Sequence, residues 1–172
     1  HEHLEVWVDD VPVGMDAAAY RRAMALMQAQ RYPAAIDILE PVVRSAQPSP
    51  SLELNLAIAY ARQGRVAEEV SVLQHVLAAM PDSAVAHNLH GVLQRRSGRL
   101  QQAQAAYAEA LRLHPGYAMA HINLGILCDI YLLNPDCAMH HYREYLQLAG
   151  AGGERVDIWL ADLEQRHARA SD

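Results

Sequence analysis

The chain has 172 residues, of which 52% are hydrophobic, and a formal net charge of -6. This length suits one domain with a continuous core, and the negative charge argues against general nucleic-acid binding, which needs a basic surface. No apolar stretch approaches the roughly 20 residues that cross a bilayer. Aromatic residues are few, at 6%, and Ala, the best helix former, is abundant. The composition therefore predicts an all-α fold.

The beginning of the chain does not follow a helical pattern. It starts at His1 without Met, and Pro12 and Gly14 interrupt the residues that follow. We expect residues 1–15 to form an irregular leader, left by processing or partly derived from a tag, and it is set aside from the fold.

The rest of the chain repeats with a fixed period. Gly64 and Gly98 lie thirty-four residues apart, as do Pro81 and Pro115. This period is typical of helix-turn-helix repeats, which stack into α-solenoids. We expect a right-handed α-solenoid of about four repeats followed by a capping helix. The expected ranges are 16–49, 50–83, 84–117 and 118–153 for the repeats, and 154–172 for the capping helix and tail.

Helix boundaries follow from local signals in chain order. Asp16 is a suitable N-cap for the first helix, and Pro33 suits the first turn of the second. In the next two repeats the helices turn at Gly64 and Gly98. In the fourth, where a glycine is expected, the chain reads Tyr-Leu-Leu-Asn-Pro over 131–135, with about one extra residue.

These residues resemble the tetratricopeptide repeat (TPR) family. Small residues at position 8 of each repeat, Ala57, Gly91 and Gly125, and large ones at position 24, such as Tyr107, fit the family pattern. Glu69 departs from it, because the family has Ala at that place. The fourth repeat fits only if its turn holds one added residue. The resemblance implies a scaffold that binds protein, and a fold match alone does not establish function.

A looser resemblance connects residues 120–129, 142–146 and 159–163 with bacterial TPR proteins, many of which resemble envelope lipoproteins. It implies a location in the bacterial periplasm or anchored to the envelope, with the cytoplasm as the alternative.

In the TPR fold the first helix of each repeat lines a concave groove, and many of the corresponding side chains here are apolar. Apolar stripes exposed on a soluble protein usually mark contact sites. Asn side chains at or near position 6 offer a donor and an acceptor to the backbone of an extended peptide; alternatively, they bridge neighbouring helices. The candidate groove residues are Tyr20, Met24, Leu54, Asn55, Ile58, Arg62, Asn88, Val92, Arg95, Arg96, Ile122, Asn123 and Ile126.

Arginines in the groove have two interpretations. They could bind carboxylates bidentately, or complement the helix dipoles at the ends of their helices. The family's carboxylate clamp for chaperone C-termini also needs Lys at two places, and this chain lacks them.

The His, Cys and Glu residues do not indicate a metal site or a catalytic site. His87, His90 and His121 could approach one another, but no Cys or carboxylate completes a metal site, so we expect neither a metal nor another cofactor. Cys128 and Cys137 are interpreted as small core residues, and a bridge between them is left open. Glu68 and Glu69 are expected on a polar face. No catalytic motif is present.

The sequence thus predicts a non-enzymatic scaffold that holds an extended or helical partner segment in its groove. The alternative is a structural subunit that joins an assembly, or a second copy of itself as a homodimer, through its ends or convex face. An enzyme or metal protein is the third and least supported hypothesis.

Overall fold

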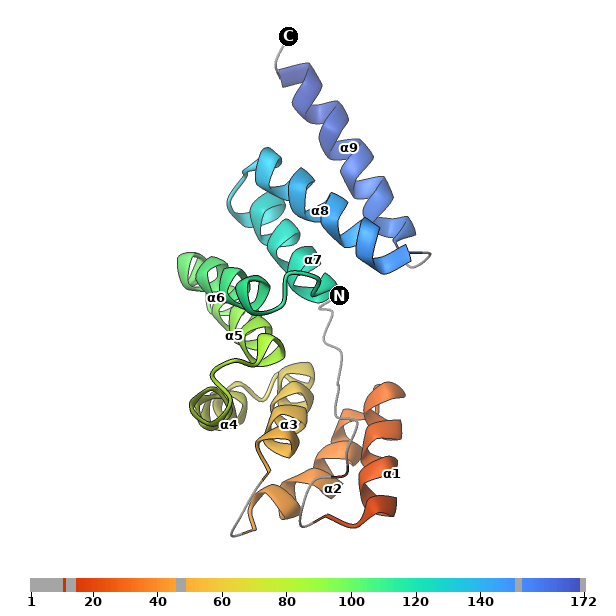
Figure 1. The fold of residues 1–172 in the computed structure, drawn as a ribbon, viewed down its shortest axis with the longest axis vertical. Coiled ribbons are helices and arrows are strands. Elements are labelled where there is room, and N and C mark those ends of the chain that lie inside the picture. Colours follow the sequence, from red (N-terminus) through yellow and green to blue (C-terminus); the bar gives the residue numbers. More distant parts are fainter. Residues whose placement is uncertain (1–10, 12–14, 46–48, 151–152, 171–172) are drawn as a thin grey trace. The chain divides into compact units, whose positions relative to one another are not determined.

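The structure is a computed structural model that describes residues 11, 15–45, 49–150 and 153–170 (Figure 1). Within these residues all regular elements are helices. The chain divides into two compact units, one within residues 4–86 and one within residues 87–172. None of the described helices combines the length and the apolar character needed to cross a membrane.

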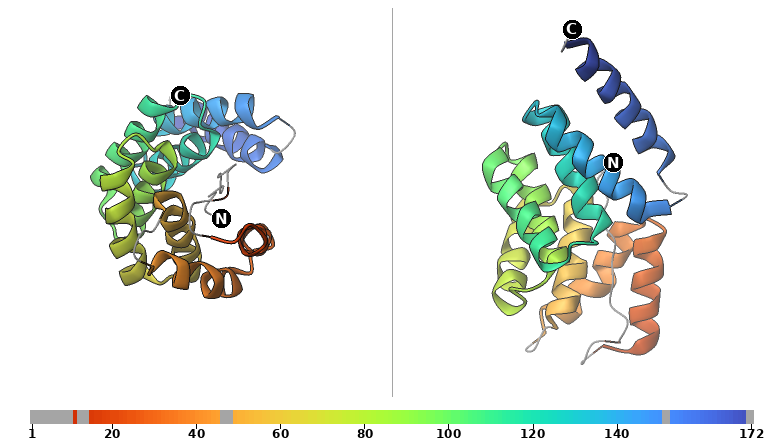
Figure 2. Two further views of the ribbon diagram at one scale, coloured as in Figure 1. Left: turned by 60° about the horizontal axis from the view of Figure 1, so that its bottom comes forward. Right: turned by 45° about the horizontal axis from the view of Figure 1, so that its top comes forward.

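The N-terminal unit contains two helix pairs (Figures 1 and 2). Helix α1 packs on α2, α2 on α3, and α3 on α4. The bounds are Ala17–Gln28 for α1, Tyr32–Val43 for α2, Pro50–Gln63 for α3 and Val66–Ala79 for α4.

The C-terminal unit also consists of paired helices, with one further helix at its end. Helix α5 crosses the boundary between the units, and α9 packs on α8, as Figure 2 shows. The bounds are Ala84–Arg96 for α5, Leu100–Leu113 for α6, Ala118–Ile126 for α7, Pro135–Ala149 for α8 and Glu154–Ala170 for α9. Between α7 and α8 a π-helix, η1, covers Leu127–Tyr131.

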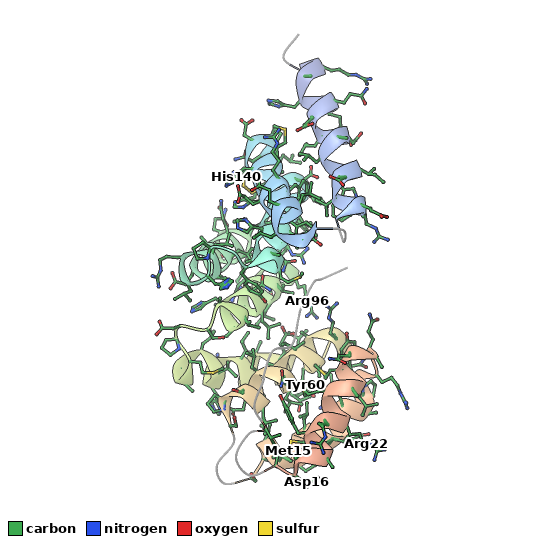
Figure 3. The ribbon with its side chains drawn as sticks, turned by 45° about the vertical axis from the view of Figure 1, so that its right-hand side comes forward. Met15, Asp16, Arg22, Tyr60, Arg96 and His140 are labelled. Carbon is green, nitrogen blue, oxygen red and sulfur yellow. A yellow bond between two sulfur atoms is a disulfide. The ribbon has the colours of Figure 1, made fainter. Side chains whose placement is uncertain are left out.

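The local signals for helix ends are confirmed. The Asp16 carboxylate accepts hydrogen bonds from the Ala18 and Ala19 amides, both 3.0 Å long, at the start of α1 (Figure 3). Pro33 lies in the first turn of α2. Gly64 and Gly98 have φ angles of 69° and 73°, which favour glycine and end α3 and α5.

Close packing explains the small and large positions of the repeat. Gly91 of α5 lies against the Tyr107 ring of α6, and a Cβ at Gly91 would overlap that ring. Gly125 of α7 meets Tyr142 of α8 in the same way, at 2.6 Å from the site of a Cβ. The second pair is one residue further apart in the sequence, so the extra residue predicted for the fourth repeat is confirmed.

A polar network joins the first two repeats in the N-terminal unit. The Tyr60 hydroxyl, labelled in Figure 3, donates to Glu40 Oε1 at 2.8 Å. The Arg65 guanidinium lies 4.5 Å from the centre of the Tyr60 ring. Burial, followed by the bond to Glu40 and its charge, raises the pKa of Tyr60 to about 12. The phenol therefore remains a donor near neutral pH, and the network has a structural role.

The expected polar face around Glu68 and Glu69 is only half correct. Glu68 pairs with Arg65 at 2.7 Å, whereas Glu69 is 0% exposed. Glu69 occupies the position at which the family packs Ala between the helices, so tertiary packing buries it although the side chain is acidic.

Candidate functional site

In the N-terminal unit the predicted groove residues are mostly buried. Tyr20, Leu54, Asn55 and Ile58 are 1–6% exposed. Asn55 Nδ2 donates to Met24 Sδ at 3.5 Å. The expectation of an exposed apolar stripe is therefore wrong for these positions. Met24 and Arg62 are half-buried, and the role of this group in binding stays a prediction.

In the C-terminal unit two predicted groove residues pair with each other. Asn123 Nδ2 of α7 donates to Asn88 Oδ1 of α5 at 3.0 Å, and both residues are 0% exposed. The pair thus bridges the first helices of adjacent repeats. Among the described residues, Asn88 Nδ2 and Asn123 Oδ1 have no hydrogen-bond partner. Val92 and Ile122 are buried as well, so the exposed-stripe expectation is also wrong for them.

The C-terminal unit also contains a cavity of about 510 Å³, which falls in the range of ligand sites. Five elements contribute to its walls, and two of the lining residues, Arg95 and Ile126, belong to the predicted groove. Ile130 and Tyr131 are 61% and 45% exposed, so the cavity opens to solvent. The lining residues are Arg95 of α5, Ile126 of α7, Asp129, Ile130 and Tyr131 of η1, Tyr142 of α8 and Trp159 of α9. Arg96, labelled in Figure 3, is exposed beside Arg95 at the end of α5.

The π-helix places three of these residues on the cavity wall. The Leu132 amide donates to Leu127 O at 3.0 Å and the Asn134 amide to Cys128 O at 2.9 Å, so the last turn is wider than an α-turn. This widening takes up the extra residue of the fourth repeat. Such π-turns are rare and often lie at functional sites.

A disulfide joins the two ends of this turn. Cys128 of η1 and Cys137 of α8 are bonded, with their Cα atoms 5.8 Å apart. The bridge that the sequence left open is therefore present, and Cys128 is also a fully buried core residue as expected. Asn134 Oδ1 also accepts from the Cys137 amide at 3.1 Å, which caps α8. Residues 128–137 are thus fixed by a covalent bond as well as by backbone hydrogen bonds.

The charged and polar side chains that line the cavity contact partners within the protein. The Tyr142 hydroxyl donates to Asp129 Oδ2 at 3.2 Å, and Arg166 Nη2 of α9 lies 3.8 Å from Asp129 Oδ1. Burial, followed by the charge of Asp129 and the bond to it, raises the pKa of Tyr142, so its hydroxyl stays a donor. The Arg95 guanidinium lies 5.8 Å from the centre of the Tyr131 ring, which is a cation–π arrangement.

A second cavity, in the N-terminal unit, has about 340 Å³ and lies beside Glu40, Tyr60 and Glu68. Its charged side chains belong to the network that joins α2, α3 and α4. The polar groups of this cavity serve the packing of the helices, so the cavity in the C-terminal unit is the stronger candidate site.

The histidines are distributed over structural contacts. His121 Nε2 lies 2.9 Å from Pro115 O and therefore donates to it, so His121 Nδ1 accepts from His141 Nδ1 at 3.0 Å. Burial, and then the charges of His121 and His140, lower the pKa of His141 to about 4. His90 instead contacts Gln94. The described residues contain no group of three or more His, Cys, Asp or Glu side chains arranged around a metal.

The predicted groove residues include Arg95 and Ile126 of the cavity lining. They do not include the other five lining residues, which are Asp129, Ile130, Tyr131, Tyr142 and Trp159. The break in the thirty-four-residue register was the signal that could have found the site. Insertions in repeat proteins map to loops on one face, which is often the binding face.

Helix pairs in a common register define a helical repeat protein. The tetratricopeptide repeat profile matches residues 20–84 and 88–129. The chain therefore belongs to the tetratricopeptide repeat family, and its predicted fold class, all-α and of the α-solenoid type, is confirmed.

Solved structures of other TPR proteins resemble the chain. A thermophilic TPR protein of Thermus thermophilus, TTC0263, is 21% identical over 88% of this chain and 82% of its own, with a TM-score of 0.73. PilF of Pseudomonas aeruginosa is 19% identical over 88% and 68%, with a TM-score of 0.74. YrrB, described as a TPR protein with an unusual peptide-binding site, is 18% identical over 84% and 73%, with a TM-score of 0.65. At these identities the likeness concerns the fold. None of the curated proteins matches the chain.

Proposed function

We propose that this protein is a non-enzymatic scaffold that binds a segment of a partner protein, and that the cavity between α5, η1 and α9 anchors that segment. The observation that carries the proposal is the cavity of about 510 Å³, because it opens to solvent and includes the predicted groove residues Arg95 and Ile126. Its apolar and aromatic walls with a few polar groups are typical of binding sites.

The Asn88–Asn123 pair joins α5 and α7, the two helices that carry Arg95 and Ile126 of the cavity wall. Buried polar groups normally have hydrogen-bond partners. Among the described residues, however, Asn88 Nδ2 and Asn123 Oδ1 have none. Asn123 lies one turn before Ile126 on α7. Asn88 and Asn123 are both 0% exposed, so the pair fixes the helices that carry Arg95 and Ile126 and does not itself contact a peptide.

Cross-linking can test the proposal with two matched positions. Ile130 and Ile158 are both largely exposed, at 61% and 68%. Ile130 lines the cavity, whereas Ile158 does not belong to its lining. A photoreactive benzoylphenylalanine would replace each residue in turn, in cells that express the protein natively. We expect Ile130 to yield a cross-link to a partner and Ile158 to yield much less. Equal yields, or a partner captured from Ile158 alone, would contradict the proposal.

The same experiment addresses the alternative of self-association. Ile158 of α9 exposes its aliphatic side chain, and this favours contact through the end of the molecule. A product of twice the mass, formed from Ile158 and absent from Ile130, would support a homodimer joined through α9 in place of the cavity.

We further propose that the protein works in an oxidising compartment of a bacterial envelope. The Cys128–Cys137 disulfide supports this location, because such bonds persist in oxidising compartments and are rare in the reducing cytosol. Thiols of freshly acid-quenched cells would be labelled with a maleimide polymer, before and after reduction. We expect a mass shift only after reduction; a full shift without reduction would contradict the proposal.

A further inference from the structure

The cavity wall is suited to an apolar side chain of moderate size. Ile126, Ile130 and Trp159 provide aliphatic and aromatic surface, and the volume of about 510 Å³ accommodates one or two large side chains. Exposed Ile130 and Tyr131 stand at the mouth, where covering them would bury apolar area and favour binding. A purely polar segment would leave this surface unused.

Electrostatics at the cavity disfavour a cation. Asp129, whose side chain is 16% exposed, already accepts from Tyr142 and lies next to Arg166. The Arg95 guanidinium also lies over one face of the Tyr131 ring. An incoming Lys or Arg would have to displace a guanidinium from either group.

An incoming carboxylate would meet the guanidinium of Arg95 at the cavity wall. Arg95 lines the cavity and Arg96 follows it, both in the last turn of α5. A guanidinium has five N–H donors, so Arg95 can bind a carboxylate and keep its other contacts. This site is cationic at its α5 edge although the chain as a whole carries a charge of -6, and such local complementarity selects partners by charge.

We propose that the cavity recognises an acidic segment of a partner protein, in which a bulky aliphatic residue is flanked by Glu or Asp. The aliphatic side chain packs against Ile126, Ile130 and Trp159, and a neighbouring carboxylate binds Arg95. This inference rests on the proposed function and specifies the chemistry of the occupant.

Trp159 provides a direct readout, because Trp7 is the other Trp of the chain. In the full-length Trp7→Phe variant, the emission of Trp159 would be followed during titration with three acetylated, amidated hexapeptides. Each has Leu at positions two and five, with Glu, Gln or Lys at the other four. We expect the Glu peptide to bind about fivefold more tightly than the Gln peptide, as a partly exposed ion pair allows, and the Lys peptide to bind most weakly.

Two variants test whether Arg95 causes the preference for the Glu peptide over the Gln peptide. Arg95→Gln should abolish the preference for Glu over Gln. Arg143→Gln is the control, because Arg143 is 53% exposed and pairs with Glu164 away from the cavity lining; it should leave the preference unchanged. Raising the salt concentration should weaken the binding of the Glu peptide and not that of the Gln peptide.

The outcomes separate this inference from the proposed function. Equal binding of the Glu and Gln peptides, tighter binding of the Lys peptide, or an unchanged preference in Arg95→Gln would overturn the acidic occupant, while cross-links from Ile130 would still support the scaffold. If no peptide changed the emission of Trp159 and Ile130 gave no cross-link, both proposals would be overturned.

Discussion

The third and fourth repeats share one packing rule and differ in their turns. Gly91 meets Tyr107 in the third, and Gly125 meets Tyr142 in the fourth. The third repeat turns at Gly98, whereas the fourth turns through a π-helix closed by a disulfide. One added residue therefore leaves the helix contact intact and changes the surface at the turn. The candidate site therefore lies where the repeat departs from its own pattern.

The largest expected effect comes from breaking the disulfide. Cys128 and Cys137 close a short loop, and loop-closure entropy for about ten residues amounts to about 2–3 kcal/mol. Reduction with dithiothreitol should lower the free energy of unfolding by this amount in urea titrations. Hydrogen exchange should rise over 127–137 and stay unchanged around Gly98. A Cys128→Ala/Cys137→Ala variant, as the control, should not respond to the reductant.

Overpacking should affect both repeats similarly. A Cβ at Gly125 would lie 2.6 Å from the Tyr142 ring, and such crowding costs about 2 kcal/mol. Gly91→Ala should cost about as much, because it meets Tyr107 in the same way. Gly116→Ala serves as the control, since its Cβ would meet ordinary contacts at 3.7 Å. Chemical denaturation measures all three; a neutral Gly125→Ala would refute the shared rule.

Acid should destabilise the fourth repeat through His141. Its folded pKa of about 4 lies below the ordinary value of 6.5, so the unfolded state binds the proton more readily between these values. Stability should fall as pH decreases from about 6.5 towards 4, on the order of 1 kcal/mol by pH 5 for a partly exposed ring. His141→Ala, which matches Ala106 of the third repeat, should flatten the curve of unfolding free energy against pH. An unchanged slope in that variant would count against this assignment.

The smallest effect should be a stabilisation at the turn. Leu133 has a φ of 50° and is 79% exposed, and a non-glycine residue in this left-handed region is strained. Leu133→Gly should therefore stabilise the protein by about 0.5–1 kcal/mol. Gln30→Gly, at a φ of 57°, provides a matched site in the first repeat. Thermal unfolding would show the gain, and a loss at position 133 would show that the Leu side chain packs usefully.

The register, the Asp16 cap and the Gly64 and Gly98 turns could be predicted, because each depends on local chemistry or on a fixed period. The one-residue insertion was also visible in the sequence, but its conformation was not, since a residue can be accommodated in a loop or in a π-turn. Burial of Glu69 and pairing of Asn88 with Asn123 depend on tertiary neighbours. The disulfide needed the geometry of the turn, because a nine-residue separation is compatible with bridged and free cysteines.

The most direct test of the account measures the affinity of the partner captured by cross-linking. Isothermal titration would compare the wild type with Ile130→Ser and Ile158→Ser, two largely exposed positions of which Ile130 lines the cavity. The account predicts that Ile130→Ser weakens binding about tenfold and that Ile158→Ser changes it less than about twofold. Equal effects, or a larger loss from Ile158→Ser, would contradict the assignment of the cavity as the binding site.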